Sequence, residues 1–427
     1  MTGVPGRSRA RASGCALVLC AAFGARGLAA EPRPWVAAGD LPIPASVRSA
    51  EVTRVDEPVY QGPSGAEPRR GAVARGARVP VFAAKRGPGC QGRFLQIGAL
   101  SWLCEDGAQL SEAAPDSDAD SVFPRSHDGM PYRYHFVGPD GSFGYHAIQT
   151  AEDGVPDAQL LKGFGVAVLR VESNREGNPF GLTTEDLWVP MRDLNPVVPF
   201  PFHGRELNGS LDVAWVTTAN ALGSPAPGKP KDPKLKLAKL QELVVLERRE
   251  LAGHHWFRFA ENAWLSDRDA RSPTPAELPT ELRPGERWID VDVASQVLTA
   301  YVGDRPIFAT LVSTGRGADG SILATPRGQH RLWVKLRTSN MDNLDDQSAS
   351  ENYAIQAVPW VMYFEKGYGL HGTFWHRDFG NKHSHGCVNL TPPDAERLFA
   401  WTSPRLPPGW TAALPTSYDP GTLIRVR

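Results

Sequence analysis

The sequence predicts a mainly β protein in which small β modules precede a larger β-rich domain at the C-terminal end. Three observations support this prediction. The 427 residues include 42 glycines and 38 prolines, which favour turns and short strands over long helices. Short runs of alternating apolar and polar residues recur along the chain. At roughly 100–200 residues per domain, the length leaves room for about two to four domains.

Composition and charge exclude two classes of protein. The 46 lysines and arginines are balanced by 47 aspartates and glutamates, for a formal net charge of −1. A nucleic-acid binder would usually carry a basic excess, so no nucleic-acid partner is expected. An uninterrupted apolar run of about 18 residues is missing from the sequence, which argues against a protein that crosses a membrane several times.

Residues 1–30 have the pattern of an export signal. Arg7, Arg9 and Arg11 form a basic start, Gly14–Ala25 is apolar, and small residues follow near Ala30. We therefore expect a signal peptide and a protein exported to the periplasm or cell envelope. Arg26 interrupts the apolar segment, which leaves an uncleaved membrane anchor open. A membrane contact is expected only in that case.

Removal of this segment leaves three cysteines, Cys90, Cys104 and Cys387. Cys90 and Cys104 flank the strand-like run 94–97, and an oxidising compartment favours a disulfide between them. Two buried free thiols are the alternative. Cys387 is then the odd cysteine, and an unpaired thiol in an exported protein is a candidate reactive group.

A faint repeat predicts three modules, at residues 51–112, 131–196 and 207–271, the middle one being the weakest. In each copy alternating apolar residues lead to a turn and a tryptophan: Trp102, Trp188 and Trp264. The pattern resembles bacterial SH3-like domains. Such modules could bind peptidoglycan, or they could be spacers whose tryptophans are core residues. A lysine run at 229–239 indicates a solvated loop that leads into a short helix or, alternatively, a contact with an anionic polymer. Residues 272–286 are rich in proline and read as a linker.

The segment 287–427 is predicted to be one β-rich domain with a single helix. Residues 289–293 alternate between apolar and acidic, and the runs 297–301 and 307–313 flank the turn 303–306, which predicts a β-hairpin. Further strands are expected at 330–336 and 360–364. Thr391 can cap a helix that starts with two prolines and buries a stripe of three residues: Ala395, Leu398 and Phe399.

A cluster of histidines and one cysteine lies just before this helix. Four of the eleven histidines fall within fifteen residues: His371, His376, His383 and His385. Cys387 follows them. Three interpretations compete. Cys387 could be a nucleophile with a histidine base, or His371, His383 or His385 could join Cys387 in a zinc site, although the spacing is not typical of one. The cluster could also be purely structural.

The nucleophile interpretation has a clear chemical basis. A thiol with a pKa of about 8.5 is only slightly ionised at neutral pH, and a neighbouring imidazole can take its proton. We expect a hairpin-like return to bring Cys387 opposite His371. Gly386 would leave space for a substrate carbonyl, and the backbone N–H groups of Gly386 and Cys387 could form part of an oxyanion site.

The run His371-Gly372-Thr373, followed by Ser384–Asn389 (Ser-His-Gly-Cys-Val-Asn), resembles the signature of the L,D-transpeptidase catalytic domain, the YkuD family. The turn Thr325–Gly328 and the strand-like Gly421–Val426 are similar to other segments of that family. The resemblance covers 287–427, about a third of the chain. One departure is His330, which stands where the family usually has an aromatic residue.

The resemblance implies a β-rich fold and a set of roles. Cys387 would attack the stem peptide of peptidoglycan and form a thioester, and His371, oriented by the Gly372 carbonyl, would be the base. Ser384, His385 and Gly386 would support the pocket and the oxyanion. Trp375 and Asn389 are candidate substrate-binding residues. We expect Trp375 to border the substrate groove and Asn389 mainly to brace the loop.

The implied activity is the formation of 3→3 cross-links between a donor and an acceptor stem peptide, without a metal or organic cofactor. Carbapenem-type β-lactams would inhibit by acylating the same sulfur. With water as the acceptor, the same site would be an L,D-carboxypeptidase. A non-catalytic peptidoglycan-binding protein is the remaining alternative.

Overall fold

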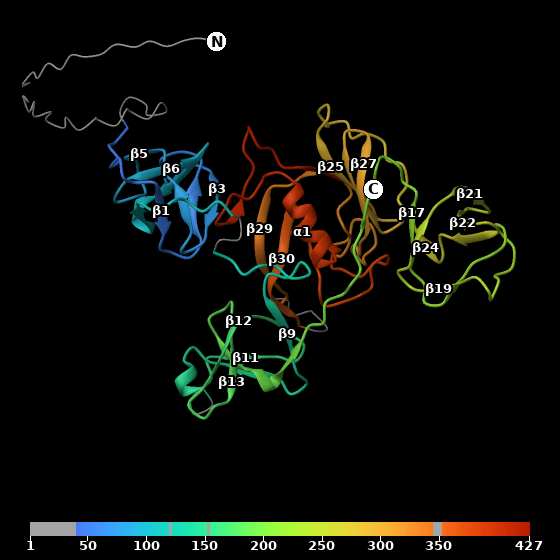
Figure 1. Cartoon of the computed structure of the whole chain (residues 1–427), viewed down its shortest axis with the longest axis horizontal. Helices are drawn as coiled ribbons and strands as arrows, with labels where there is room; N and C mark the ends of the chain where they lie inside the picture. Colours follow the sequence, from blue (N-terminus) through green and yellow to red (C-terminus); the bar gives the residue numbers. More distant parts are fainter. Residues whose placement is uncertain (1–39, 119–121, 152–153, 345–351) are drawn as a thin grey trace, which may run out of the picture.

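A computed structural model describes residues 40–118, 122–151, 154–344 and 352–427 (Figure 1). The predicted signal peptide at residues 1–30 lies outside the described residues. In the ranges just given, every helix is too short or too polar to span a bilayer. Strands dominate, and α1 is the sole α-helix of the described chain.

The N-terminal unit folds as two small sheets around a shared apolar core. One sheet has the order β4-β1-β8 and the other includes β5-β6-β7-β2-β3. Between them lie side chains such as Val59, Leu95 and Leu103, which the alternating pattern directs inward. The strands are β1 (Ser49–Val52), β2 (Glu57–Tyr60), β3 (Arg69–Val73), β4 (Arg78–Pro80), β5 (Ala83–Lys85), β6 (Phe94–Gly98), β7 (Ser101–Cys104) and β8 (Ala108–Ser111), with the 3₁₀ turn η1 (Glu105–Gly107).

The second unit is built around the long strand β12, which pairs with β9 and β13. Its strands are β9 (Arg133–Val137), β10 (Ser142–Gly144), β11 (Ala158–Leu160), β12 (Gly165–Ser173), β13 (Pro179–Thr183), β14 (Trp188–Pro190) and β15 (Leu194–Pro196), with the turns η2 (Ile148–Thr150) and η3 (Met191–Asp193). Trp188 is buried in its core, which fits the interpretation of the repeated tryptophans as core residues.

The third unit has three small sheets, one of which is the meander β21-β22-β23. Its strands are β17 (Val213–Val216), β18 (Ala221–Leu222), β19 (Lys236–Leu237), β20 (Glu242–Val244), β21 (Glu247–Leu251), β22 (His254–Ala260), β23 (Ala263–Ser266) and β24 (Ala270–Arg271). The lysine run lies mainly in an exposed loop, as expected, but this loop leads into the strand β19, so the expected short helix is wrong. The SH3-like resemblance of the three units stays a prediction.

The C-terminal domain has two sheets and one helix around a large core. Its elements are β25 (Arg287–Asp292), β26 (Val297–Val302), β27 (Arg305–Leu311), β28 (Gly328–Arg331), β29 (Val334–Asp342), β30 (Ala354–Glu365), β31 (Tyr368–Gly372), β32 (Val388–Leu390), α1 (Pro392–Trp401), β33 (Trp410–Ala413) and β34 (Leu423–Val426). The predicted hairpin is formed by β26 and β27, with β25 antiparallel to β26 on the other side, and α1 begins after Thr391 and buries the predicted stripe. His330, on β28, packs its ring against Phe364 at 5.3 Å.

The smaller units surround this domain and share strands with it (Figure 1). β3 of the first unit pairs with β33, and β12 of the second unit touches β30. β16 (Arg205–Glu206), which precedes the third unit, pairs with β27. Backbone pairing therefore ties the first unit, the second unit and the segment that leads into the third unit to the domain that contains the histidine and cysteine cluster.

Candidate active site

The predicted base lies on β31, and the predicted nucleophile directly precedes the neighbouring strand β32. The two strands pair in parallel, with His371 opposite Asn389. Cys387 directly precedes β32, two residues before Asn389, so the alternation of side chains directs it toward the same face. The expected hairpin-like return is wrong: two parallel strands need a crossover connection, and residues 373–387 provide it.

His371 is held in one orientation by its neighbours. Its ring is buried, and its Nδ1 lies 3.2 Å from the carbonyl oxygen of Gly372 and 3.3 Å from Oγ1 of Thr373. Since a carbonyl only accepts, Nδ1 carries the proton and Nε2 keeps its lone pair. Trp375 stacks on the ring at 5.6 Å. Burial lowers the pKa of His371 to about 4, so the imidazole is neutral at neutral pH.

Cys387 is the one unpaired cysteine of the described residues, whereas Cys90 and Cys104 form a disulfide with an S–S distance of 2.07 Å. The Cys387 side chain is half-buried, and its Sγ lies 3.8 Å from the Gly367 carbonyl oxygen. Burial raises the pKa of this thiol, and a backbone hydrogen bond from Gly369 opposes the shift. The resting site therefore contains an uncharged thiol and an uncharged imidazole.

Hydrogen bonds of Ser384 and Thr325 fix the turn before the nucleophile. Ser384 Oγ accepts from the Gly386 N–H at 3.1 Å and donates to the Cys387 carbonyl at 2.5 Å. Thr325 Oγ1 donates to the Gly386 carbonyl at 2.8 Å, which gives the Thr-Pro-x-Gly turn a structural role. Because the Gly386 N–H is engaged by Ser384, it would have to change partner to serve an oxyanion. Its oxyanion role stays a prediction.

Gly386 is required by its backbone and by its surroundings. Its φ of +124° is one that L residues rarely adopt. A Cβ built there would lie 2.4 Å from Cε1 of Tyr368. The hydroxyl of Tyr368 donates to the Ile322 carbonyl at 2.9 Å, so this ring is itself anchored. The glycine beside the nucleophile thus allows the Tyr368 ring to pack against the turn.

His385 is exposed and points to a different set of partners. Arg316 donates to its Nε2 at 2.9 Å, and Tyr353 stacks on its ring at 5.6 Å. A guanidinium on Nε2 does not suit a zinc ligand, because the cation repels a metal ion. Across the described chain, the His, Cys, Asp and Glu atoms close enough to share a metal are those of Cys90, Cys104 and Asp106, and the two sulfurs there form the disulfide.

His376 and Asn389 brace the connection between base and nucleophile. The Asp378 N–H donates to His376 Nδ1 at 3.2 Å, and burial lowers the pKa of His376 to about 3. The neutral ring then carries its proton on Nε2, which lies 2.9 Å from the Asn389 amide. An N–H donor needs an acceptor, so the oxygen of the Asn389 amide faces His376 Nε2. The oxygen and nitrogen of an amide have nearly the same shape and can exchange places by a flip. Asn389 is thus engaged by the loop.

Aromatic residues that the sequence did not single out complete the surroundings. Phe374 lies 5.2 Å from Trp375 and 4.2 Å from Tyr134 of the second unit. Trp375 also lines a cavity of about 280 Å³ with Phe136, Phe374 and residues 196–198. Tyr363 and Tyr353 lie close enough to Cys387 for a thiolate there to raise their pKa further, although burial is the main cause. The sequence predicted that Tyr363 lies on a strand. It could not predict that Tyr363 lies near Cys387, because that contact depends on the fold.

Comparison with known proteins agrees with the motif. Residues 286–426 match the YkuD family, described as the L,D-transpeptidase catalytic domain. The Bacillus subtilis (strain 168) protein YciB, provisionally named an L,D-transpeptidase, is 28% identical over 142 residues, which are 31% of this chain and 68% of that protein.

The chain was also compared with solved structures. A mutant Enterococcus faecium L,D-transpeptidase is 20% identical, with a TM-score of 0.25, over 33% of this chain and 50% of its own. L,D-transpeptidase 3 from Mycobacterium tuberculosis is 16% identical, with a TM-score of 0.26, over 33% and 60%. The imipenem complex of LdtMt1 is 19% identical, with a TM-score of 0.27, over 41% and 77%. The chain thus spans about half of the E. faecium protein. The family match places a YkuD-type L,D-transpeptidase catalytic domain at residues 286–426.

Proposed function

We propose that this protein is a peptidoglycan L,D-transpeptidase that forms 3→3 cross-links through a thioester on Cys387. The observation that carries the proposal is the neutral, buried His371, whose Nδ1 is held by the Gly372 carbonyl on the strand next to the nucleophile. Export to the cell envelope, where the polymer lies, and inhibition by carbapenems belong to the same proposal.

In the first half-reaction the Cys387 sulfur attacks the carbonyl of the third residue of a tetrapeptide stem. The thiol proton passes to Nε2 of His371 as the C–S bond forms. The bond to the terminal D-alanine then breaks, and the imidazolium gives its proton to the leaving amine. In the second half-reaction an amine of a neighbouring stem attacks the thioester, loses a proton to His371, and returns the thiol.

The direct test is to incubate the full chain with tetrapeptide muropeptides and to weigh the products. Cross-linked dimers support the proposal, whereas tripeptides alone would indicate a carboxypeptidase that uses water. Cys387→Ala should abolish both products, and His371→Ala should lower the rate by about 10³-fold or more. His255→Gln, at an exposed histidine of the third unit, is the control and should keep the wild-type rate.

Carbapenem labelling offers a second readout that needs no acceptor. Opening of the lactam ring by a sulfur adds the whole molecule, so the protein mass should rise by one carbapenem. Peptide mapping should place the adduct on Cys387, with the Cys90–Cys104 disulfide peptide unmodified as an internal control. An unlabelled Cys387 under conditions where the protein is folded would contradict the thioester mechanism.

A further inference from the structure

Arg316 lies next to the turn that carries the nucleophile, and its backbone is fixed to that turn. Gly315 forms a parallel bridge with Ser384, and the Arg316 N–H donates to the Ser384 carbonyl at 3.0 Å. The Gly315 N–H donates to Oγ1 of Thr325 at 2.9 Å, and the same hydroxyl donates to the Gly386 carbonyl at 2.8 Å. These hydrogen bonds give the Arg316 backbone a constant position beside the nucleophile.

The guanidinium of Arg316 is held by a second contact. It donates through Nη2 to Nε2 of His385 at 2.9 Å. Burial, together with the charge of Arg316, lowers the pKa of His385, so this ring is neutral and its Nε2 can accept the bond. His385 comes two residues before Cys387, so the Cα atoms of these two residues are at most about 7 Å apart.

Aromatic rings connect this guanidinium with the catalytic base. Tyr353 stacks on His385 at 5.6 Å. Tyr353 and Trp375 pack on the same apolar cluster, and Trp375 stacks on His371 at 5.6 Å. Arg316 and His371 are therefore linked through one set of neighbouring rings.

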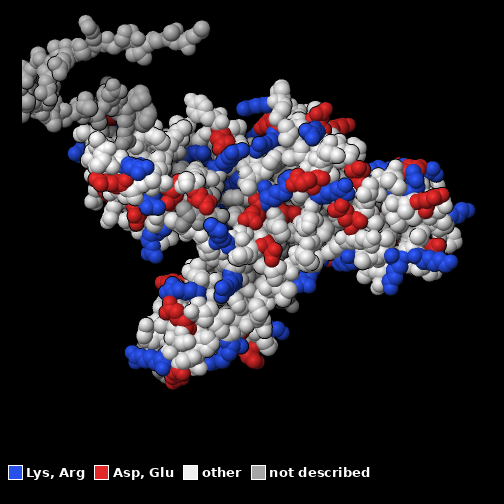
Figure 2. All heavy atoms as spheres, viewed as in Figure 1, with Lys and Arg blue, Asp and Glu red and all other residues white. Residues whose placement is uncertain are grey.

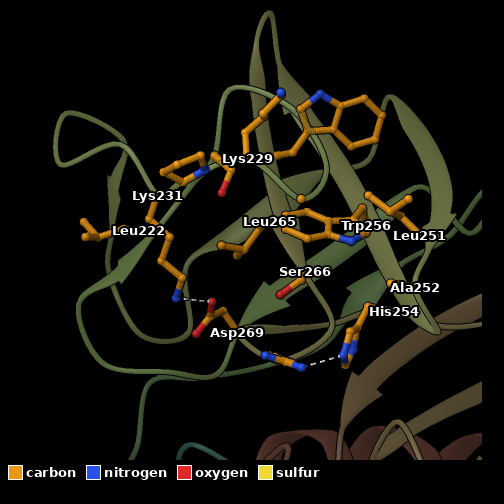
Figure 3. Close-up of a pocket in the computed structure, with 15 residues that line it drawn as sticks. Leu222, Lys229, Lys231, Leu251, Ala252, His254, Trp256, Leu265, Ser266 and Asp269 are labelled. Carbon is orange, nitrogen blue, oxygen red and sulfur yellow. Dashed lines mark hydrogen bonds and ion pairs between the residues drawn. The ribbon is translucent and has the colours of Figure 1, made fainter.

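The charge of Arg316 is not neutralised by a carboxylate of the described chain, and the side chain is exposed. Other cations are paired. Arg327 lies 2.8 Å from Asp319, and Lys231 donates to Asp269 at 2.7 Å beside the cavity of about 480 Å³ in the third unit (Figure 3). The planar fork of an arginine matches a carboxylate, so the free donors of Arg316 suit a carboxylate of the substrate.

We propose that Arg316 is a specificity-determining residue that binds the terminal carboxylate of the donor stem peptide. This assignment rests on the proposed function. In that reaction the sulfur attacks the carbonyl of the third residue, so the carboxylate of the terminal D-alanine lies one residue beyond the bond that breaks. A stem of five residues carries its terminal charge about 3.5 Å further along the chain. Arg316 thus favours stems that end one residue after the attacked carbonyl.

The contact acts on binding and not on the reacting atoms. The carboxylate is charged before the C–N bond breaks and stays charged afterwards, so Arg316 stabilises the bound substrate and the transition state to a similar extent. Loss of such a contact raises KM and leaves kcat unchanged. Arg316→Gln should therefore raise the KM for a tetrapeptide about tenfold, with kcat within about twofold of the wild type.

The binding test compares two donor peptides that differ only in the terminal group. The full chain carrying Cys387→Ala is titrated by calorimetry with a stem tetrapeptide as the free acid and as the terminal amide. The parent should bind the acid about tenfold more tightly. Adding Arg316→Gln should remove this preference and leave binding of the amide unchanged. Arg175→Gln, at an exposed arginine of the second unit, is the control and should keep the preference.

A second measurement separates recognition of the carboxylate from an effect on the thiol. Iodoacetamide is uncharged and alkylates Cys387 without any need for a carboxylate contact. In the chain that retains Cys387, Arg316→Gln should react with this reagent at the wild-type rate. Circular dichroism checks that each variant is folded.

The outcomes distinguish this inference from the proposed function. A parent that binds the acid and the amide equally, or binds neither, overturns the inference. Equal weakening of both peptides in Arg316→Gln also overturns it, since the contact would then be with another part of the stem. A slower reaction with iodoacetamide, or a lower kcat at unchanged KM, would place the effect on the thiol and overturn it too. A preference for the acid that depends on Arg316, in a protein that leaves muropeptides unchanged, would support this contact and refute the proposed function.

Discussion

Burial controls the chemistry of the two central side chains. It raises the pKa of Cys387 and lowers that of His371 to about 4, so both groups favour their uncharged forms. Because both shifts disfavour the charged forms, the thiolate–imidazolium pair is disfavoured at rest. The proton must therefore move as the C–S bond forms, and the thiol is protected from indiscriminate oxidation between turnovers.

The depressed pKa of His371 predicts an unusual acid limit. A protonated imidazole cannot accept the thiol proton, so acylation by a carbapenem should be present above the folded pKa and lost as the pH falls through about 4. We expect a constant rate between about pH 5.5 and 7. The rate is measured across this range, with circular dichroism at each pH. A midpoint near 6.5 would show that water reaches the imidazole.

Gly386→Ala tests the contact between the turn and Tyr368. The φ of +124° at this position is strained for alanine, and the added Cβ would lie 2.4 Å from Tyr368. Together these should shift the turn and slow acylation of Cys387 by a carbapenem at least about tenfold. Backbone strain alone costs on the order of 1–3 kcal/mol. Gly177→Ala is the matched control, because its φ is +86° and no atom lies within 4 Å of its added Cβ. Equal losses of stability in both variants, with normal acylation, would rule out the Tyr368 contact.

At the scale of elements, α1 is held at both ends by buried ionisable groups. At its N-terminal end Asp394 accepts from the Gly204 N–H at 2.9 Å and from Thr310 at 2.5 Å. At its C-terminal end Lys335, from β29, donates to the carbonyls of Phe399 and Thr402, the second at 2.9 Å. A cation there also suits the negative end of the helix dipole. The helix is thus fixed beside β31, the strand that carries His371.

Lys335 should make stability depend on alkaline pH. Burial lowers its pKa to about 7, below the 10.5 of an exposed lysine. Between these values the unfolded chain binds a proton that the folded chain does not, so this group's contribution to the free energy of unfolding rises with pH from about 7 to 10. Urea unfolding of the wild type and Lys335→Met is compared at several pH values. The free energy of unfolding of the wild type should rise relative to that of Lys335→Met as the pH rises. A difference that stays constant with pH would refute the lowered pKa of Lys335.

The sequence predicted local features better than contacts between distant segments. The start of α1 after Thr391 and its buried stripe were predicted, because both signals lie within a few residues, but the Thr391 side chain makes no capping hydrogen bond. The Ser-His-Gly-Cys run identifies the domain through its family. The parallel pairing of β31 and β32 was missed, because the order of strands depends on the whole sheet. Phe374 carried no distinguishing signal, since its partner Tyr134 is some 240 residues away.

At the scale of the whole molecule, two units support the loop between His371 and Cys387 from separate contacts. Tyr134 of the second unit packs on Phe374 at 4.2 Å, and Trp215 of the third unit shares a cluster with Phe379. Charges of both signs are interspersed over the face in Figure 2, consistent with the net charge of −1. Apolar contacts and strand pairing, rather than a single-sign charged surface, therefore join the units.

Phe374→Ala tests whether the second unit positions the base. Loss of this ring removes the support of Trp375, which stacks on His371, so carbapenem acylation should slow about tenfold or more. Tyr134→Phe is the control: it keeps the ring against Phe374 but loses the 2.6 Å hydrogen bond to the Ala357 carbonyl. That variant should lose about 1 kcal/mol of stability and keep its rate. A slow Tyr134→Phe with a normal Phe374→Ala would contradict this role.

The shared strands have a practical consequence for anyone who expresses the domain by itself. A fragment cut at residue 286 would lose β3 from beside β33 and β16 from beside β27. Both edges would then offer unpaired amides and carbonyls to other copies, which is a known route to insoluble aggregates. Boundaries drawn from family similarity therefore differ here from the boundaries of independent folding, and soluble recombinant material should begin upstream of the first unit.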